Sequence, residues 1–197
     1  KEAFSRGNSI YLADRVIPML PERLSNQICS LRPKEEKLTY SCLMEIDPKG
    51  KVIKYRIVKS LIQSRAKLNY DEVQAFFDTG KSNKNLSGLE QTLKEMLKLS
   101  QILHQKRISK GSLDFDLPEA KVLVGKDGRV LDIFKQERLE SHRLIEEFML
   151  LANQCVAKYA SLLRVPFLYR VHDQPDKEKI ENFAEFISTL GYKFPVE

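Results

Sequence analysis

Residues 141–163 read SHRLIEEFMLLANQCVAKYASLL and form the longest stretch of the chain with helical periodicity. Apolar side chains recur three and four positions apart, which predicts a helix with one buried face. Its length makes it the central helix around which the other elements would pack. The residues predicted for the buried face are Ile145, Phe148, Met149, Ala152, Val156, Tyr159 and Leu163.

A polar stripe lies beside that face. Glu146 and Asn153 are seven residues apart, and His142 lies four residues before Glu146, so all three share nearly one angle at about 3.6 residues per turn. Such a stripe is typical of a solvated helix flank. A carboxylate inside a central helix is also what a ligand contact would require, and periodicity alone leaves both interpretations open.

Outward from this helix, two pairs of stretches have strand composition. Residues 38–46 and 51–63 are rich in β-branched and aromatic side chains and flank the turn sequence DPKG, which predicts an antiparallel hairpin. Residues 121–124 and 130–134 flank GKDG and predict a second hairpin. The Gly-Lys pair in that turn lacks the spacing of a phosphate-binding loop.

The region around the first hairpin has a surplus of positive charge. Between Leu31 and Tyr70 there are ten Lys or Arg and four acids, so ten minus four gives +6, which equals the net charge of the whole chain. Such a surplus could neutralise phosphates and release counterions, although a solvated strand face would have the same composition. Alternation in the second arm predicts a buried face of Ile53, Tyr55 and Ile57 and a basic face of Lys54 and Arg56.

Capping residues predict the starts of the shorter helices: Asn69 with Glu72, Ser87 with Glu90, and Asp176. Hairpins interspersed with helices indicate an α+β fold, in which a mixed or antiparallel sheet packs with the long central helix. The other predicted elements are helices at 21–31, 69–77, 87–109 and 176–190, a strand at 167–171 and a mobile polar loop at 78–87.

Composition excludes several classes. With 42% hydrophobic residues, a chain of 197 residues can bury one core, so one domain or part of one is expected. No apolar run reaches the roughly 18 residues of a membrane span, and the first residues lack the apolar centre of a signal peptide, so we expect a cytoplasmic protein without membrane contact. The three cysteines are widely spaced and predict neither a disulfide framework nor a zinc site.

The most distinctive local sequence is SIYLADRVIPMLPERLSNQICSL at residues 9–31. Pro18 and Pro21 each fix φ and push the preceding residue towards extended geometry, which predicts a stiff connector over residues 16–20 and a helix beginning at Pro21. A rigid connector that presents Tyr11 suits a wall beside a ligand. A buried loop with a core tyrosine would have the same spacing.

This segment, together with four others in the same order, resembles the catalytic (RNB) domain of the ribonuclease II and ribonuclease R superfamily of 3′-to-5′ exoribonucleases, and more closely its ribonuclease R side. The resemblance covers nearly the whole chain, so residues 1–197 would be the middle part of that domain without a complete second domain. The other matching segments are KLNYDEV at 67–73, GSLDFDLPEA at 111–120, HRLIEEFMLLAN at 142–153 and LYRVHDQP at 168–175.

The resemblance assigns roles to four residues. Tyr11 and Phe115 would contact bases at the outer end of a short stack of single-stranded RNA. Tyr70 would lie beside the terminal nucleotide, where family members use a tyrosine to set the length of the final product. Glu146, rather than Glu147, would hold the sugar of the 3′-terminal nucleotide. Tyr70 and Glu146 are therefore the candidate catalytic residues.

The resemblance also implies a cofactor that this chain would not hold. Family members hydrolyse RNA to nucleoside 5′-monophosphates with Mg²⁺ bound by clustered aspartates, and that motif does not occur here. We expect the metal ligands to lie upstream and the cleavage-site arginine downstream of these residues, and we expect no nuclease activity from this chain alone.

Two other classes of function stay open. A non-catalytic module could bind single-stranded RNA through the basic hairpin and the aromatic rings. A protein-interaction domain could dock a partner along the helix that contains Leu93 and Leu103. Only the RNA-binding interpretations predict affinity for RNA that falls steeply with salt.

Overall fold

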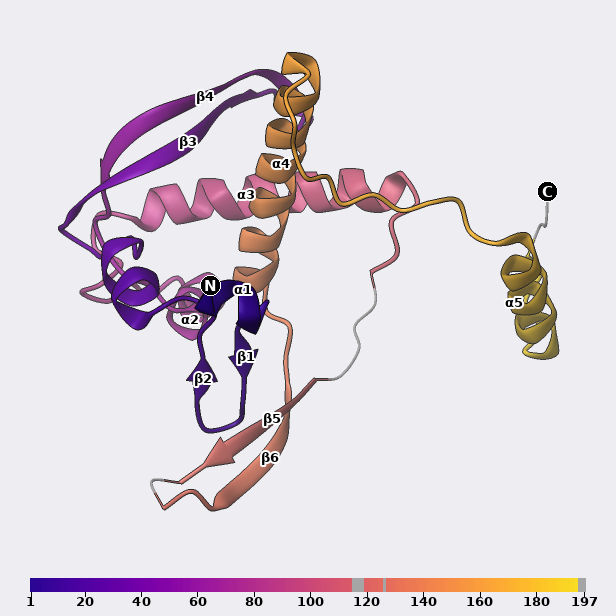
Figure 1. The fold of residues 1–197 in the computed structure, drawn as a ribbon, viewed down its shortest axis with the longest axis horizontal. Coiled ribbons are helices and arrows are strands. Elements are labelled where there is room, and N and C mark those ends of the chain that lie inside the picture. Colours follow the sequence, from indigo (N-terminus) through magenta and orange to yellow (C-terminus); the bar gives the residue numbers. More distant parts are fainter. Residues whose placement is uncertain (115–118, 126, 195–197) are drawn as a thin grey trace. The chain divides into compact units, whose positions relative to one another are not determined.

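The computed structural model describes residues 1–114, 119–125 and 127–194 (Figure 1). The chain forms two compact units, Lys1–Lys158 and Tyr159–Glu197. Helices and small antiparallel sheets alternate along it, which confirms the α+β prediction. The elements are α1 Glu2–Arg6, β1 Ile10–Tyr11, β2 Val16–Ile17, the π-helix η1 Arg23–Ile28, β3 Glu36–Ile46, β4 Val52–Gln63, α2 Tyr70–Thr79, α3 Glu90–Ser109, β5 Glu119–Val124, β6 Val130–Gln136, α4 Glu140–Leu163 and α5 Lys177–Thr189.

Each sheet within the described residues is a two-stranded antiparallel hairpin. The pairs β3–β4 and β5–β6 confirm the two predicted hairpins, and Tyr55 lies opposite Met44 in the longer one. The third hairpin pairs Tyr11 in β1 with Val16 in β2. The stiff connector expected at 16–20 therefore begins with a strand, β2. Alternation of polar and apolar residues could not predict this strand, because it is only two residues long.

The turn between β3 and β4 packs directly on α3. The carboxylate of Asp47 accepts hydrogen bonds from the backbone N–H groups of Lys49 at 2.9 Å and Lys51 at 2.8 Å. Gly50 has φ +69° and is buried, and a Cβ built there would lie 3.0 Å from a side-chain carbon of Ile102. Both the left-handed backbone and the close approach to α3 therefore require glycine at this position.

Substituting Gly50 by alanine should lower the free energy of unfolding by more than the strained backbone conformation alone explains. Gly80 also has φ +69°, but nothing lies within 4 Å of its Cβ position, so Gly80→Ala isolates the cost of the left-handed backbone, about 1–2 kcal/mol. We expect Gly50→Ala to cost about 1 kcal/mol more, because the methyl group crowds α3. Urea unfolding of both variants measures this difference, and equal costs would contradict the tight packing of the turn.

A small apolar core joins α2, the following loop and α3. It consists of Val73, Phe76, Leu86 and Leu93, of which Leu86 is 1% exposed. The loop at 78–87 is polar and largely exposed, as predicted, but the buried Leu86 anchors it to this core instead of leaving it free. The Asn83 side chain adds three hydrogen bonds, donating to the Glu72 carboxylate at 2.6 Å and accepting from the N–H groups of Asn85 at 2.9 Å and Leu86 at 3.1 Å.

Two of the three predicted helix caps are present. Asn69 accepts a hydrogen bond from the Glu72 N–H at 2.8 Å, and Asp176 accepts one from the Glu178 N–H at 2.9 Å. The cap predicted at Ser87 is wrong, because α3 begins after Leu89 without a side-chain cap. The hydroxyl of Ser82 donates to Glu90 at 2.6 Å instead.

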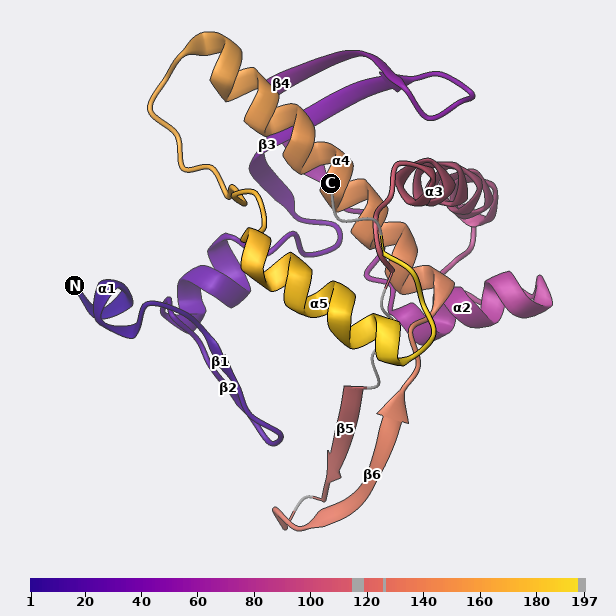
Figure 2. The ribbon, with the colours of Figure 1, turned by 90° about the vertical axis from the view of Figure 1, so that its right-hand side faces the viewer.

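The central helix α4 crosses α3 and reaches β3 (Figures 1 and 2). Its buried positions include Leu144, Glu147 and Cys155, and the Cys155 thiol contacts the sulfur of Met44 at 3.7 Å. Residues predicted for the core face are more open, with Met149 56% exposed. The helix is thus rotated from the predicted orientation, so that an acidic residue faces the interior.

The segment after Pro18 and the smaller unit differ from prediction in detail. The helix predicted at 21–31 is a π-helix over Arg23–Ile28, in which the Cys29 N–H donates to the Leu24 carbonyl at 2.9 Å. The strand predicted at 167–171 is absent, and that stretch has no regular structure. Helix α5 is present as predicted, but none of its residues is buried.

None of the helices in the described parts of the chain combines the length and apolar character needed to cross a membrane.

Candidate RNA-binding site

The first turn of α2 presents an aromatic ring to α4. The Asn69 cap fixes the helix start, so Tyr70 becomes the first helical residue. Its ring lies 4.2 Å from the His142 ring, centroid to centroid, with 30° between the planes. Tyr70 is 45% exposed, so part of the ring stays open to a ligand.

A hollow of about 540 Å³ adjoins this aromatic pair. Strands β5 and β6 contribute Lys121, Lys135 and the Phe134 ring to its lining, beside Tyr70 and His142. Asp71 and Glu137 also line the hollow, so its two lysines are balanced by two acids. The open aromatic surface is the feature that suits a nucleotide, because a base stacks on rings. Sequence reasoning did not select Lys121 or Lys135, because alternation marks them only as strand residues.

Glu146 lies one turn after His142 on the same side of α4, and an arginine holds it. Arg138, just ahead of α4, donates to the Glu146 carboxylate at 2.5 Å and also donates to Asp114. These bonds raise the pKa of Arg138 and lower the pKa of Asp114. The Glu146 side chain keeps 42% exposure, so its carboxylate is oriented but accessible.

The neighbouring Glu147 has a different environment. Its side chain is 5% exposed and accepts two hydrogen bonds from Arg107, at 2.7 and 3.0 Å. The His104 ring lies 3.1 Å away on the same carboxylate oxygen. Because Glu147 is enclosed and paired, Glu146 is the member of the pair that a ligand can reach.

The remaining predicted residues are not joined to this cluster. Tyr11 lies in β1, is 78% exposed and has no described contact with Tyr70 or Glu146. Phe115 lies outside the described residues. Asn153 is exposed further along α4. The structure therefore brings together Tyr70, His142 and Glu146, and the roles of Tyr11 and Phe115 stay predictions.

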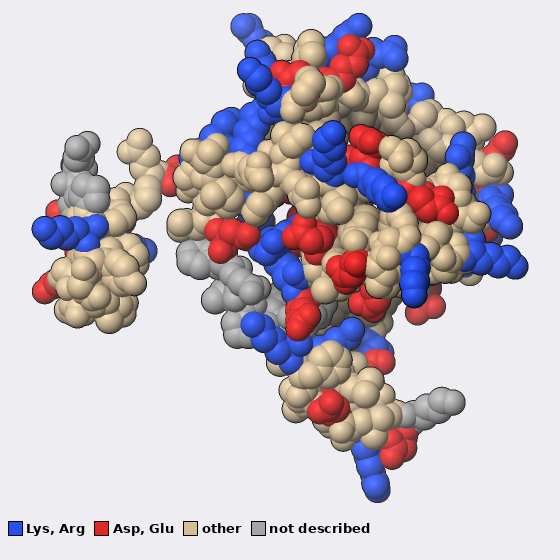
Figure 3. All heavy atoms as spheres, turned by 180° about the vertical axis from the view of Figure 1, so that it is seen from behind, with Lys and Arg blue, Asp and Glu red and all other residues tan. Residues whose placement is uncertain are grey.

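The basic hairpin is only partly as expected. Lys54 and Arg56 are exposed, as predicted, but Ile53 on the opposite face is 68% exposed rather than buried. Tyr55 and Ile57 are half-buried. On the face of the larger unit drawn in Figure 3, positive and negative side chains are interspersed.

Three acids near the Tyr70–His142 pair are bonded to protein cations. Asp114, Glu146 and Glu147 are each bonded to arginine, and His104 lies within 3.6 Å of Asp114. Within the residues that the structure describes, no group of three or more His, Cys, Asp or Glu could hold a metal ion. These donors do not fit Mg²⁺, which requires free carboxylate oxygens.

Comparison with known proteins finds relatives along nearly the whole chain. The sequence is 43% identical to Ribonuclease R 1 of Lactococcus lactis over 97% of this chain and 24% of that protein. It is 44% identical to Ribonuclease R of Aquifex aeolicus over 98% of this chain and 28% of that protein. The chain therefore spans about a quarter of the length of these curated relatives.

A solved structure has the same fold. Mycoplasma genitalium RNase R, determined in complex with ribose-methylated single-stranded RNA, superposes with a TM-score of 0.91 at 28% identity, covering 99% of this chain and 31% of that one. The RNB domain family matches residues 1–194. Because that match covers nearly all of the sequence and the relatives named above agree, the chain belongs to the RNB domain family.

Proposed function

We propose that this chain is part of a 3′-to-5′ exoribonuclease and forms the surface that holds the 3′ end of single-stranded RNA. The observation that carries the proposal is the cluster of Tyr70, His142 and Glu146, in which the open Tyr70 ring packs against His142 and an accessible carboxylate lies one helical turn after that histidine. The cluster occurs in a chain related over its full length to ribonuclease R.

Each part of the cluster has a physical task. The open part of the Tyr70 ring stacks on the terminal nucleotide, which is indifferent to base identity because every base has an aromatic face. Glu146 accepts hydrogen bonds from the ribose hydroxyls, and the 2′-hydroxyl is the group that distinguishes RNA from DNA. Lys121 and Lys135 line the adjoining hollow together with Asp71 and Glu137, and the two lysines would contact the phosphates.

The complete protein would release nucleoside 5′-monophosphates by hydrolysis. In this proposal its Mg²⁺ is held by residues that do not belong to this chain, and no residue described above is assigned to the metal. The outer end of the RNA would reach Tyr11 and Phe115. We further propose that the chain by itself does not hydrolyse RNA and that the protein works in the cytoplasm.

The alternative in which α3 docks a partner protein finds less support. Its apolar positions Leu93 and Leu103 are each 7% exposed, and Met96 packs against the core that Leu93 shares with α2. Those side chains are therefore already engaged within the larger unit.

The Tyr70 ring provides the test of the proposed function. Tyr70→Ala in the complete protein should leave a longer final product and weaken binding of short RNA about tenfold, because a stacked base contributes roughly 1–3 kcal/mol. Tyr70→Phe should preserve both properties. The measurement is the length distribution of products from a 5′-labelled single strand.

Tyr40→Ala is the matched control, because Tyr40 is 74% exposed on β3, away from the cluster. An unchanged final product from Tyr70→Ala would contradict the proposed position of this ring.

A further inference from the structure

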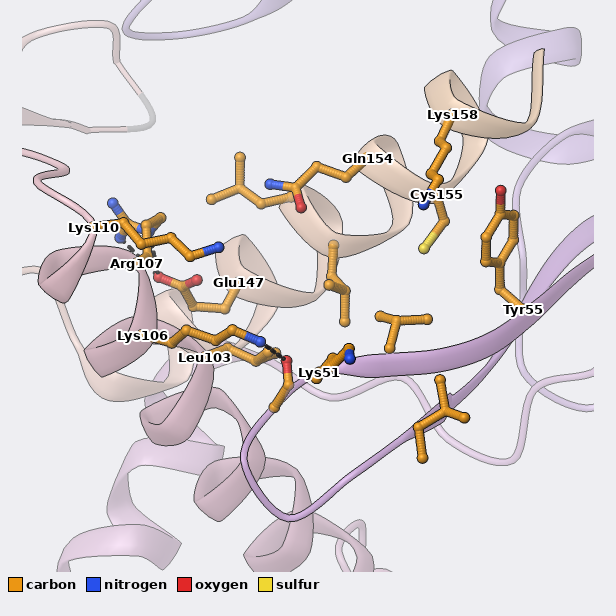
Figure 4. Close-up of a pocket in the computed structure, with 15 residues that line it drawn as sticks. Lys51, Tyr55, Leu103, Lys106, Arg107, Lys110, Glu147, Gln154, Cys155 and Lys158 are labelled. Carbon is orange, nitrogen blue, oxygen red and sulfur yellow. Dashed lines mark hydrogen bonds and ion pairs between the residues drawn. The ribbon is translucent and has the colours of Figure 1, made fainter. Parts of the chain in front are cut away.

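A second hollow, of about 480 Å³, lies between the start of β4, the end of α3 and the middle of α4 (Figure 4). It does not include Tyr70, His142 or Glu146. Cationic side chains from all three segments line it, and we call it the basic pocket. The cations are Lys51, Lys106, Arg107, Lys110 and Lys158.

The positive charge of the basic pocket is largely uncompensated. Glu147 is the one acid in its lining, and Arg107 and His104 already occupy that carboxylate. Asp47 lies nearby, where Lys106 and Lys51 help to lower its pKa. In the described parts of the chain, neither Lys110 nor Lys158 takes part in an ion pair. Five cations against two acids leave a net charge of +3 around one cavity.

The wall of the basic pocket is rigid. Lys106 donates a hydrogen bond to the Gly50 carbonyl at 2.7 Å, which ties the β3–β4 turn to α3. The close approach of Gly50 to Ile102 and Leu103 excludes a larger residue there. The backbone of Lys51, next in sequence to Gly50, is therefore held beside α3, so the loss of entropy on binding is confined to the exposed lysine side chains.

The rest of the lining suits a nucleotide better than an isolated anion. Tyr55 presents its ring on the β4 side, and Leu103, Leu150 and Leu151 add apolar surface. Gln154 supplies amide donor and acceptor groups from α4. Lysines that neutralise phosphate next to an aromatic ring are the combination with which proteins bind nucleotides without sequence preference.

We propose that the basic pocket binds a nucleotide phosphate at a site separate from the Tyr70 cluster. Lys51, Lys110 and Lys158 contact the phosphate oxygens, and Tyr55 packs against the attached nucleoside. The ligand is a nucleotide unit, either within a strand of RNA or free in solution. The choice of RNA as one source of the nucleotide rests on the proposed function. The charge and lining of the basic pocket are independent of it.

The test removes three cations without disturbing the turn. The triple variant Lys51→Gln, Lys110→Gln, Lys158→Gln is compared with Lys81→Gln, Lys84→Gln, Lys98→Gln, which removes the same charge from exposed lysines outside the basic pocket and outside the basic hairpin. Binding of a fluorescent single-stranded oligonucleotide to the complete protein is measured at several salt concentrations, with a chelator present to prevent hydrolysis.

The expected result follows from counterion release. Each phosphate contact on a single strand contributes about 0.7 to the slope of log affinity against log salt, so the pocket variant should lose about 2 from that slope and bind about 100-fold more weakly at about 0.1 M salt. The control variant should change affinity less than about threefold. A pocket variant that matches the control in slope and affinity would overturn the proposal.

Adenosine 5′-monophosphate distinguishes the two sources of the ligand. If the pocket variant still binds the oligonucleotide more weakly than the control variant when this nucleotide is saturating, the basic pocket holds strand phosphates. If the difference disappears, and dialysis shows that the nucleotide binds the control variant but not the pocket variant, the pocket holds a free nucleotide. If Tyr70→Ala changes the final product but the pocket variant has the same salt slope as its control, the proposal of the basic pocket is refuted and the proposed function is not.

Discussion

Replacing Arg107 by methionine is expected to destabilise the contact between α3 and α4 by about 3 kcal/mol. The substitution leaves the Glu147 carboxylate, whose side chain is 5% exposed, without its two guanidinium bonds. Breaking a buried ion pair typically costs 3–5 kcal/mol, and the lower end applies because His104 still contacts Glu147. Amide hydrogen exchange within α3 and α4 of the complete protein measures this local stability.

Two further variants make that prediction specific. The double variant Arg107→Met, Glu147→Met removes both charges and should recover most of the lost stability, because no buried charge remains unpaired. Arg15→Met breaks the exposed pair with Asp14 and should cost less than about 1 kcal/mol. If Arg107→Met costs no more than Arg15→Met, the pair between α3 and α4 is not a structural contact.

Replacing Glu146 by alanine should lower kcat/KM for single-stranded RNA about 100-fold, which corresponds to about 2.7 kcal/mol. The variant loses a charge-assisted hydrogen bond to the terminal ribose, and such bonds contribute about 1.5–3 kcal/mol. It also leaves Arg138 with Asp114 as its remaining described partner. The measurement is the initial rate of nucleotide release by the complete protein.

Glu45→Ala provides the control for this loss. Glu45 is an exposed acid on β3 with no described ion pair, and its removal changes the net charge by the same amount. We expect its kcat/KM to stay within about twofold of the unmodified protein. A rate for Glu146→Ala as high as that of Glu45→Ala would exclude a role for this carboxylate at the RNA end.

The central helix shows how far the sequence predicts the fold. Periodicity located α4 to within one residue of Ser141, but it assigned Ile145 and Met149 to the core and left Glu147 outside. Glu147 is buried because Arg107, 40 residues earlier in the chain, neutralises it. A partner at that separation leaves no signal in the local sequence pattern. The positions of apolar residues alone therefore predicted the wrong buried face for the helix.

Turn and cap residues predicted the positions of structural elements more reliably than composition did. The sequence DPKG located the β3–β4 turn, and Asn69 located the start of α2, because each acts through its immediate neighbours. The anchoring of the loop at 78–87 was not predicted, since one leucine among polar residues gives little indication of an anchor. The strand expected at 167–171 failed because a strand needs a partner.

The candidate site was predictable only in part. The family resemblance selected Tyr70 and Glu146, and helical spacing placed His142 beside Glu146. The tertiary structure was needed to show that Tyr70 contacts His142 and that Arg138 orients the carboxylate. Arg138 precedes Glu146 by eight residues and lies outside the helix that contains it. Its role therefore cannot be read from helical spacing.

The central claim is that Glu146 contacts the ribose of the 3′-terminal nucleotide. The most direct measurement compares two single strands that differ only in the terminal sugar, ribose or 2′-deoxyribose, with the unmodified protein and with Glu146→Ala. We predict that the unmodified protein prefers the ribose terminus at least tenfold and that the variant treats the two strands alike, since its contact to the 2′-hydroxyl is gone. An equal preference for ribose in both proteins would contradict the claim.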